Sequence, residues 1–306
     1  MMITPPPLKP GDLIGLIAPA SPASEKELAG AQSSLSLLGL KARFYPSCKS
    51  THGFLAGSDS LRAQDLMDAF QDPDIKGIFC LRGGYGCGRL LPLLDFEIIK
   101  KNPKLFLGYS DISVLQIAFQ QLCSLISIHG TMPSINWEKT DDFTIRTLKR
   151  CLFGFPQGPM ENPPDQKREC LFSGRAQGPV TGGNLSLVVS TLGSAYEIDT
   201  KGKILFLEDI DEKPYSVDRM LTALSLAGKF RDASGILLGS WINCEETKEN
   251  TPSLTIREIF QEVVLPWKKP TILNFRCGHT YPQLSFPMGA LTQMDADSCR
   301  VSFLPW

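Results

Sequence analysis

Hydrophobic and polar residues alternate along the first half of the chain in a pattern that predicts strands separated by helices. Short apolar runs bounded by Gly, Pro, Ser and Asp are typical of buried strands. The segments between them carry apolar residues at helical spacing, as Leu61, Leu66 and Phe70 do within residues 59–70. The predicted strands cover 13–18, 42–45, 77–81, 105–109 and 125–129, and a further helix is predicted over 25–38. This order favours βαβ units, a mostly parallel sheet and an α/β fold class.

The pattern changes between residues 151 and 177, where Gly and Pro crowd a polar segment with little periodicity. Such a segment is typical of a linker, so we predict an N-terminal domain over 1–150, a linker over 151–177 and a C-terminal domain over 178–306. The second domain again alternates the two kinds of element. Helices are predicted at 185–192, 217–227 and 256–264, and strands at 203–207, 235–238 and 271–274.

Composition excludes several classes of partner. The 306 residues suffice for two domains, and 42% hydrophobic with 21% charged residues is typical of a soluble globular protein. A net charge of -1 gives no attraction to nucleic acid or to an anionic membrane. The apolar runs fall far short of the roughly 20 residues that span a bilayer, and the N-terminus has no secretory signal pattern. We therefore expect a cytoplasmic protein with no nucleic-acid or membrane partner.

Cysteine usage points to the same compartment. The 9 cysteines are scattered through apolar segments, and no two have Cys-x-x-Cys spacing. This predicts buried free thiols in a reducing compartment. Cys277 and His279 lie too close together for a usual structural zinc site, so no metal site is expected.

Residues 104–111 form the most informative segment of the chain. A short apolar strand ends on Gly108-Tyr109-Ser110-Asp111 and turns directly into a helix predicted over 112–121. A serine at such a corner is held out of the sheet, and the first helix amides face whatever its hydroxyl attacks, which is the geometry of a nucleophile elbow. The usual second glycine is replaced, since the pattern is Gly-x-Ser-x-Ile. Serine is also a preferred N-cap, so this segment alone admits either a nucleophile or a helix cap at Ser110.

A serine nucleophile needs a base, and the chain has 3 histidines. His52 lies in a polar turn, which is typical of a solvated surface residue. His129 ends an apolar strand, where a satisfied core histidine is expected. His279 lies in a loop after a predicted strand, where catalytic groups are commonly displayed. Glu208, at the end of the strand predicted over 203–207, is well placed to orient a loop histidine.

Arg82-Gly83-Gly84-Tyr85-Gly86 follows another predicted strand at once. Glycines at a strand end let the backbone approach a ligand closely. The Gly-x-x-x-x-Gly-Lys-Ser/Thr pattern of a phosphate loop is absent. A backbone amide that faces the serine, as in an oxyanion hole, is therefore the favoured interpretation.

Taken together and in this order, the motifs resemble those of the LD-carboxypeptidases. This family of serine peptidases includes muramoyltetrapeptide carboxypeptidase and the microcin C self-immunity peptidases. The resemblance runs over nearly the whole chain. It is carried by Gly11-Asp12, residues 17–22, 82–86 and 108–111, His129-Gly130, residues 182–185 and 207–209, Pro214-Tyr215, and Gly278-His279.

The resemblance implies a Ser-Glu-His triad in that chain order, with Ser110 as nucleophile, His279 as general base and Glu208 orienting the base. It implies oxyanion donors at the amide of Asp111 and at a glycine of the turn, for which we favour Gly84. The implied fold is an N-terminal flavodoxin-like or Rossmann-like parallel sheet domain that carries the serine. A C-terminal swivelling β/α domain would carry the other two residues, with the site between the domains. Family members are commonly homodimers and need no metal, and no cofactor is implied.

The implied reaction is hydrolysis of the bond between the L-configured centre of a diamino acid and a terminal D-alanine of murein tetrapeptide, during peptidoglycan recycling. Asn184 and Arg82, polar residues beside glycine turns, are candidates for reading the D-Ala carboxylate. Two other functions stay open. One is a microcin C-type immunity peptidase that cleaves an aminoacyl-sulfamoyl adenylate, although no inserted aromatic loop is present. The other is a non-catalytic nucleotide- or sugar-binding α/β protein, in which Ser110 only caps a helix.

Overall fold

The computed structural model describes residues 2–248 and 251–304. The chain forms two compact units. Unit 1 comprises Met1–Pro156 and Leu284–Gly289, and unit 2 comprises Gln157–Gln283 and Ala290–Trp306. Residues 1, 249–250 and 305–306, which the predicted domain ranges include, lie outside the described residues. The α/β fold class predicted from the sequence is confirmed.

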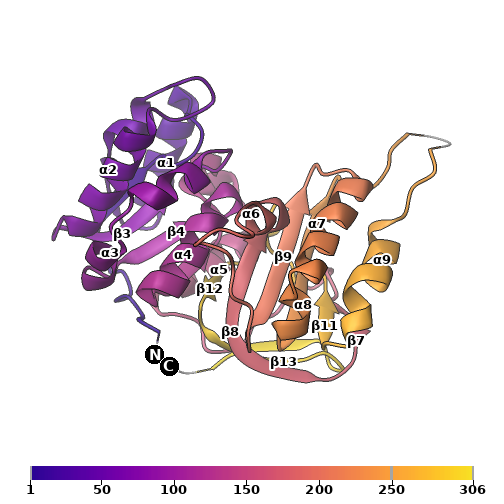
Figure 1. Ribbon diagram of the computed structural model, residues 1–306. Helices are drawn as coiled ribbons and strands as arrows, with labels where there is room; N and C mark the ends of the chain where they lie inside the picture. Colours follow the sequence, from indigo (N-terminus) through magenta and orange to yellow (C-terminus); the bar gives the residue numbers. More distant parts are fainter. Residues whose placement is uncertain (1, 249–250, 305–306) are drawn as a thin grey trace. The chain divides into compact units, whose positions relative to one another are not determined.

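Unit 1 is built, over its described residues, on a six-stranded sheet with the order β12-β5-β4-β3-β1-β2 (Figure 1). β1 to β5 run parallel to their neighbours, whereas β12 pairs antiparallel with β5 at the edge. The inner strands β3 and β4 are largely apolar and are buried except at Lys76, as expected when helices cover both faces. The bounds are β1 Leu13–Ile17, β2 Lys41–Phe44, β3 Ile75–Cys80, β4 Leu105–Gly108, β5 Ser127–His129 and β12 Phe286–Met288.

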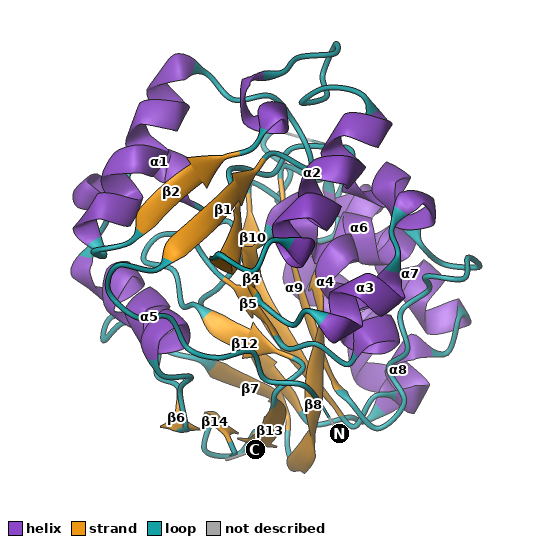
Figure 2. Cartoon of the chain, turned by 90° about the vertical axis from the view of Figure 1, so that its left-hand side faces the viewer, coloured by secondary structure: helices purple, strands orange, loops and turns teal. Residues whose placement is uncertain are grey.

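Helices lie on both faces of this sheet, with α1 and α5 on one side and α2, α3 and α4 on the other (Figure 2). Polar side chains cap several of them. Ser24 and Glu27 form a capping box on α1, and the side chains of Ser58, Asp95 and Asp141 accept amides at the starts of α2, α3 and α5. The bounds are α1 Glu25–Leu37, α2 Asp59–Gln71, α3 Phe96–Lys101, α4 Ser113–Cys123 and α5 Asp142–Phe153.

Three buried aromatic rings pack α2 and α4 against the sheet of unit 1. Phe106 of β4 lies 4.9 Å from Phe119 of α4 and 6.3 Å from Phe70 of α2, measured between ring centroids. Phe70 and Phe119 are 5.6 Å apart and perpendicular. Such pairs contribute about 0.5–1.5 kcal/mol each beyond the area that they bury. They fix the strand that leads to Ser110 and the helix that follows it.

Unit 2 contains, within its described residues, an eight-stranded sheet with the order β6-β14-β13-β8-β9-β10-β11-β7. β8 joins its two parts, because Arg175–Pro179 pairs antiparallel with β13 and Val180–Asn184 pairs parallel with β9. In Figure 1 this strand is long and curved. The bounds are β6 Gly158–Pro159, β7 Glu169–Phe172, β8 Arg175–Asn184, β9 Ile204–Ile210, β10 Gly235–Ile242, β11 Thr271–Leu273, β13 Leu291–Asp295 and β14 Arg300–Phe303.

The helices of unit 2 follow the parallel strands. α6 packs against α7, and α7 in turn packs against α8 and α9. The bounds are α6 Leu185–Ser190, α7 Pro214–Leu226, α8 Lys229–Asp232 and α9 Ile256–Ile259, the last continued by a π-helical turn over Phe260–Val264. Within the described part of the chain, no helix is long and apolar enough to cross a membrane.

The observed units divide the chain differently from the predicted domains. Residues 151–177, predicted as a linker, contain the end of α5 and the strands β6 and β7. Leu284–Gly289, predicted within the C-terminal domain, belongs to unit 1 because β12 pairs with β5 there. Edge strands this short are held by pairing with distant residues, and they leave no local signal of apolar periodicity.

Candidate active site

Ser110 stands at the corner between β4 and α4 in unit 1. Tyr109 is extended, with φ -159°, and Ser110 then has φ 66°, a left-handed conformation that is uncommon for a residue with a Cβ. A short 3-10 turn over Ser110–Ile112 leads into α4. The N-cap positions of the turn and of the helix are Tyr109 and Ile112, so Ser110 lies just inside the turn and occupies neither cap position. The strained corner matches the elbow expected from the sequence.

The glycine turn after β3 passes beside Ser110. A Cβ built on Gly83 would lie 3.0 Å from the Ser110 Cβ and 3.1 Å from its Oγ, so a larger residue would crowd the serine side chain. Gly84 has φ 117°, and a Cβ there would lie 2.3 Å from Ser21 Oγ. The turn therefore presents bare backbone to the serine, as an oxyanion hole requires. Gly84 as the donor stays a prediction.

Arg82 begins this turn. Its Nη1 donates to the Pro22 carbonyl at 3.2 Å and pairs with Glu27 at 3.2 Å, and its side chain is 37% exposed. These contacts tie the glycine turn to the loop between β1 and α1. A contact between Arg82 and a substrate carboxylate stays a prediction.

Glu208 and His279 form a close pair in unit 2. Glu208 lies near the end of β9 and is fully buried, and its Oε2 is 2.9 Å from His279 Nδ1. The same oxygen accepts the His279 amide at 3.2 Å. Gly278, with φ 91°, makes the approach possible, because a Cβ there would lie 2.2 Å from Glu208 Oε2. The carboxylate thus holds both the ring and the backbone of the histidine, which fixes the ring orientation.

The charge of Glu208 changes the basicity of its partner. Burial favours the neutral imidazole, but the hydrogen bond to Glu208 and the negative charge of that carboxylate outweigh burial. The pKa of His279 is consequently raised above the 6.5 of a free histidine. A raised pKa makes His279 a stronger base, as proton abstraction from a hydroxyl requires.

Asn184 has a structural role that the sequence does not reveal. Its side-chain oxygen accepts the Leu187 amide at the start of α6, and its Nδ2 donates to buried Asp209 at 2.7 Å. Asp209 also accepts the backbone amide and the hydroxyl of Ser186, at 3.0 and 2.7 Å. This network joins the end of β9 to α6. A contact of Asn184 with substrate stays a prediction.

The other two histidines lie as the sequence predicts. His52 is exposed. His129 is fully buried, with its ring centroid 5.9 Å from that of Tyr109 and 5.2 Å from that of Phe286. Of the nine cysteines, Cys170 and Cys299 are partly exposed and the rest are buried. Among residues 2–248 and 251–304, no group of three or more His, Cys, Asp or Glu side chains is arranged to hold a metal ion.

The sequence-predicted residues therefore gather in two places. Ser110, Asp111 and the glycine turn come together in unit 1, and Glu208 and His279 come together in unit 2. Sequence reasoning missed Arg62, which is fully buried in α2 and donates to the Gly86 carbonyl of the turn at 3.0 Å. A charged residue on an amphipathic helix is ordinarily solvent-facing, so no local signal marks it.

Several known proteins are similar to this chain over most of its length. Residues 14–130 match the LD-carboxypeptidase N-terminal domain, and residues 177–294 match the LD-carboxypeptidase C-terminal domain. The chain is 40% identical over 290 residues to the probable murein peptide carboxypeptidase of Bacillus subtilis, covering 94% of this chain and 90% of the relative. It is 31% identical over 299 residues to the murein tetrapeptide carboxypeptidase of Pseudomonas aeruginosa, covering 94% of each. The crystal structure of an MccF-like protein from Bacillus anthracis matches with a TM-score of 0.87 at 28% identity, over 99% of this chain and 100% of that one.

Proposed function

The chain belongs to the LD-carboxypeptidase family of serine-type carboxypeptidases, and from this premise we propose that it hydrolyses the bond between the L-configured centre of a diamino acid and a terminal D-alanine in murein tetrapeptides. The observation that carries the proposal is the buried Glu208–His279 pair, with 2.9 Å between Oε2 and Nδ1. Taking a carboxylate out of water is costly. A buried carboxylate that orients a single histidine is typical of a catalytic pair, in which the carboxylate also stabilises the imidazolium.

In the first half of the proposed reaction, Ser110 attacks the carbonyl carbon of the amide. His279 Nε2 takes the proton from Ser110 Oγ as the new C–O bond forms, and Glu208 stabilises the resulting imidazolium. The negative charge that develops on the carbonyl oxygen is held by the backbone amides of Asp111 and Gly84. His279 then gives its proton to the departing amine, so the C–N bond breaks and D-alanine leaves.

In the second half, water resolves the ester between Ser110 and the shortened peptide. His279 takes a proton from water, the hydroxide adds to the ester carbonyl, and the same amides hold the oxyanion. Collapse of the second intermediate returns the proton to Ser110 Oγ. The sum is addition of one water across one amide bond, with no other reactant consumed.

Murein peptides are favoured as substrates because two relatives carry that description in their names, at 40% and 31% identity. The match to an MccF-like structure, together with the match to microcin C7 self-immunity protein MccF in complex with aspartyl sulfamoyl adenosine, keeps an aminoacyl-sulfamoyl adenylate as the second candidate substrate. Both substrates would use the same serine chemistry. They differ in the leaving group, which is a D-amino acid in one and a sulfamoyl adenosine in the other.

The experiment is release of free D-alanine from a disaccharide tetrapeptide, measured with a coupled D-amino-acid oxidase assay. Wild type should release D-alanine from the tetrapeptide but not from a pentapeptide that ends in D-Ala–D-Ala, because that terminal bond joins two D centres. Ser110→Ala and His279→Ala should lose activity by about 10³-fold or more. An aminoacyl-sulfamoyl adenosine is tested in parallel.

Ser124→Ala is the matched control. Ser124 is another partly buried serine of unit 1 with a left-handed backbone, φ 54°, at the C-terminal end of α4. Its substitution should leave D-alanine release unchanged. A wild type that releases no D-alanine, or full activity in Ser110→Ala, would contradict the proposed function. Cleavage of the aminoacyl-sulfamoyl adenosine alone would favour the second substrate.

The homodimer and the role in peptidoglycan recycling stay predictions that rest on the resemblance to the family, and the cytoplasmic location stays a prediction that rests on composition and cysteine usage. Light scattering on the purified chain at several concentrations tests the first. A mass of about twice the 33.7 kDa of one chain is expected.

A further inference from the structure

The side chain of Asp111 turns away from solvent, although it follows the candidate nucleophile directly. An acidic residue in the first turn of a helix usually stays exposed and interacts with the helix dipole. Asp111 is instead buried, and its Oδ2 accepts the backbone amide of Cys87 at 2.7 Å. Burial raises the pKa of Asp111, and the amides of Cys87 and Gly86 act against this by stabilising the ionised form. The carboxylate therefore binds the far end of the glycine turn.

Arg62 holds the same end of the turn from another direction. Its guanidinium is fully buried, and Nη1 donates to the carbonyls of Gly86, at 3.0 Å, and of Pro19. These carbonyls belong to the loops that leave β3 and β1. A planar guanidinium reaches two such acceptors at fixed angles, which a lysine cannot do. Arg62 thus links the two loops to α2.

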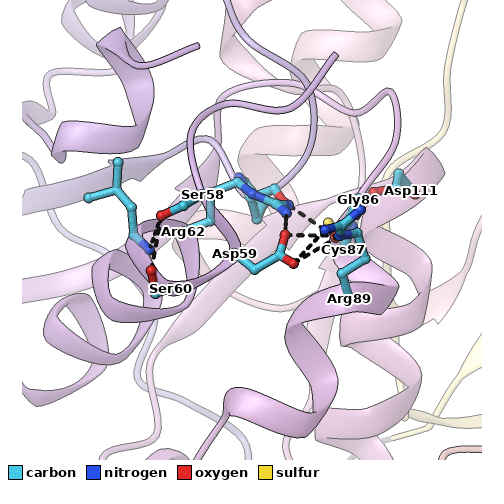
Figure 3. Close-up of polar contacts among 10 residues, drawn as sticks. Ser58, Asp59, Ser60, Arg62, Gly86, Cys87, Arg89 and Asp111 are labelled. Atoms are coloured by element: carbon cyan, nitrogen blue, oxygen red, sulfur yellow. Dashed lines mark hydrogen bonds and ion pairs between the residues drawn. The ribbon is translucent and has the colours of Figure 1, made fainter. Parts of the chain in front are cut away.

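The charge of Arg62 is balanced within the cluster (Figure 3). Its Nη2 pairs with Asp59 on the first turn of α2, and Asp59 is held in turn by Arg89, with Nε at 2.9 and 3.0 Å and Nη2 at 2.8 Å. Arg62 and Arg89 thus share the carboxylate of Asp59, and the carboxylate of Asp111 lies close enough to Arg62 for their charges to attract each other. A buried charge is tolerated only when it is compensated in this way.

The residues that precede these anchors form the part of the turn nearest the candidate nucleophile. Gly83 faces Ser110, and the Gly83 carbonyl accepts the Ser21 amide at 3.4 Å. The Tyr85 amide donates to Ser21 Oγ at 3.2 Å. A run of glycines has little conformational preference of its own, so its shape depends on such external contacts.

We propose that the side chains of Asp111 and Arg62 are positioning residues that hold the turn 83–86 beside Ser110, so that its amides are already aligned for the oxyanion before substrate binds. The inference rests on the proposed function, because it assigns these side chains to the oxyanion hole of that reaction. Oxyanion donors act by being aligned in advance, and a misplacement of about 1 Å can cost about 10²-fold in rate. Neither side chain touches substrate in this account.

The test measures kcat and KM for D-alanine release in Asp111→Ala, Asp111→Asn and Arg62→Gln. Asp111→Ala should lower kcat by about 10- to 100-fold with KM within about twofold, because an oxyanion hole binds the transition state and not the substrate. Asp111→Asn keeps an oxygen that accepts the Cys87 amide, so it should retain kcat within about fivefold of wild type. Arg62→Gln should lower kcat by about as much as Asp111→Ala does.

Two controls separate positioning from general loss of stability. Arg43→Gln breaks an ion pair with Asp72 in the same unit, where Arg43 is 42% exposed. Asp95→Ala removes the side chain that accepts two amides at the start of α3. Both should leave kcat unchanged. Wild-type kcat in Asp111→Ala, or an equal loss of kcat in Asp95→Ala, would overturn the proposal.

Hydrogen exchange of the peptide that covers 83–87 keeps this test independent of the reaction. Exchange of this peptide should rise by about tenfold in Asp111→Ala and in Arg62→Gln, and should stay at the wild-type rate in Asp95→Ala. Unchanged exchange in both positioning variants would overturn the proposal even if their activity falls. A wild type without D-alanine release would refute the proposed function instead, and the exchange rates would still decide whether the two side chains hold the turn.

Discussion

The substitution Glu208→Gln removes the charge that faces His279 while keeping the shape of the side chain. One carboxylate oxygen, Oε2, accepts both Nδ1 at 2.9 Å and the His279 amide at 3.2 Å. A glutamine oxygen in that place keeps both bonds, whereas a glutamine NH2 there would face the amide donor. The geometry therefore selects the glutamine orientation that preserves the imidazole tautomer and leaves Nε2 able to take a proton.

The cost of this substitution follows from the charge alone. A hydrogen bond to a charged group contributes about 1.5–3 kcal/mol, and one between neutral groups about 0.5–1.5 kcal/mol. The imidazolium of His279 thus loses about 1–1.5 kcal/mol of stabilisation, which lowers its pKa and slows the reaction by about tenfold. The glutamine NH2 replaces Glu208 Oε1, which is buried and has no hydrogen-bond partner among the described residues. Placing an NH2 group there without an acceptor should lower the free energy of unfolding but should not slow the reaction.

The assay is the pH dependence of kcat/KM for D-alanine release over about pH 5 to 9. Neutral His279 is the base and Glu208 raises its pKa, so the wild-type rate should rise with pH through a pKa above 6.5. In Glu208→Gln the same rise should come at lower pH. Glu208→Ala also loses the orientation of the ring and should cost about 10³-fold or more.

Two results would refute this reasoning. An unchanged or higher pKa in Glu208→Gln would show that the carboxylate charge does not set the basicity of His279. A loss as large as that of Glu208→Ala would show that the glutamine reverses the tautomer. Glu245→Gln, which neutralises an exposed acid of unit 2, is the matched control and should leave both the rate and its pH dependence unchanged.

Three further substitutions test local geometry. Ser110→Gly should abolish activity, yet its free energy of unfolding should exceed that of Ser110→Ala by about 0.5–1 kcal/mol, because glycine adopts φ 66° without strain. Gly278→Ala should lose activity and about 1–3 kcal/mol of stability in urea unfolding, since its Cβ would lie 2.2 Å from Glu208 Oε2; wild-type behaviour would contradict the geometry. Asn184→Ala should lower the free energy of unfolding by about 1–3 kcal/mol, because it breaks the bond to buried Asp209 and a helix cap. A rise in KM at unchanged stability would instead support a substrate contact.

The parallel strands are the elements that the sequence predicts best. β3, β4, β9 and β10 are buried on both faces, which requires near-continuous apolar runs, and each was predicted within a few residues of its bounds. β8 was not predicted, because its sequence Arg-Ala-Gln-Gly-Pro-Val-Thr-Gly-Gly-Asn has the composition of a turn. Its Gly182 runs so close to β9 that a Cβ would lie 1.9 Å from the Phe206 carbonyl oxygen. The close approach of the two backbones requires glycine here, and a strand rich in glycine lacks the apolar alternation by which a strand is predicted.

The candidate site likewise contains residues that the sequence predicts and residues that it does not. Ser110 and His279 follow apolar strands and Glu208 lies near the end of one, so their places along the chain were enough to make them candidates. The cluster of Asp59, Arg62 and the Asp111 side chain depends on which face of α2 is buried and on a loop some 24 residues away, as in the bond from Arg62 to Gly86. Periodicity describes one element at a time, so contacts between elements of this kind appear only in the folded chain.

The backbone of Ser110 gives an argument for a nucleophile that does not depend on the family. Serines that cap helices here have extended backbones, with φ -80° at Ser24 and φ -64° at Ser58. Ser124 is left-handed like Ser110, but it ends α4, where a left-handed residue commonly closes a helix. Ser110 begins a helix, and its left-handed backbone costs roughly 1–2 kcal/mol that glycine would avoid. Strain of this kind persists where a side chain must be displayed at a fixed place, and the side chain displayed here is a hydroxyl beside a turn of bare backbone.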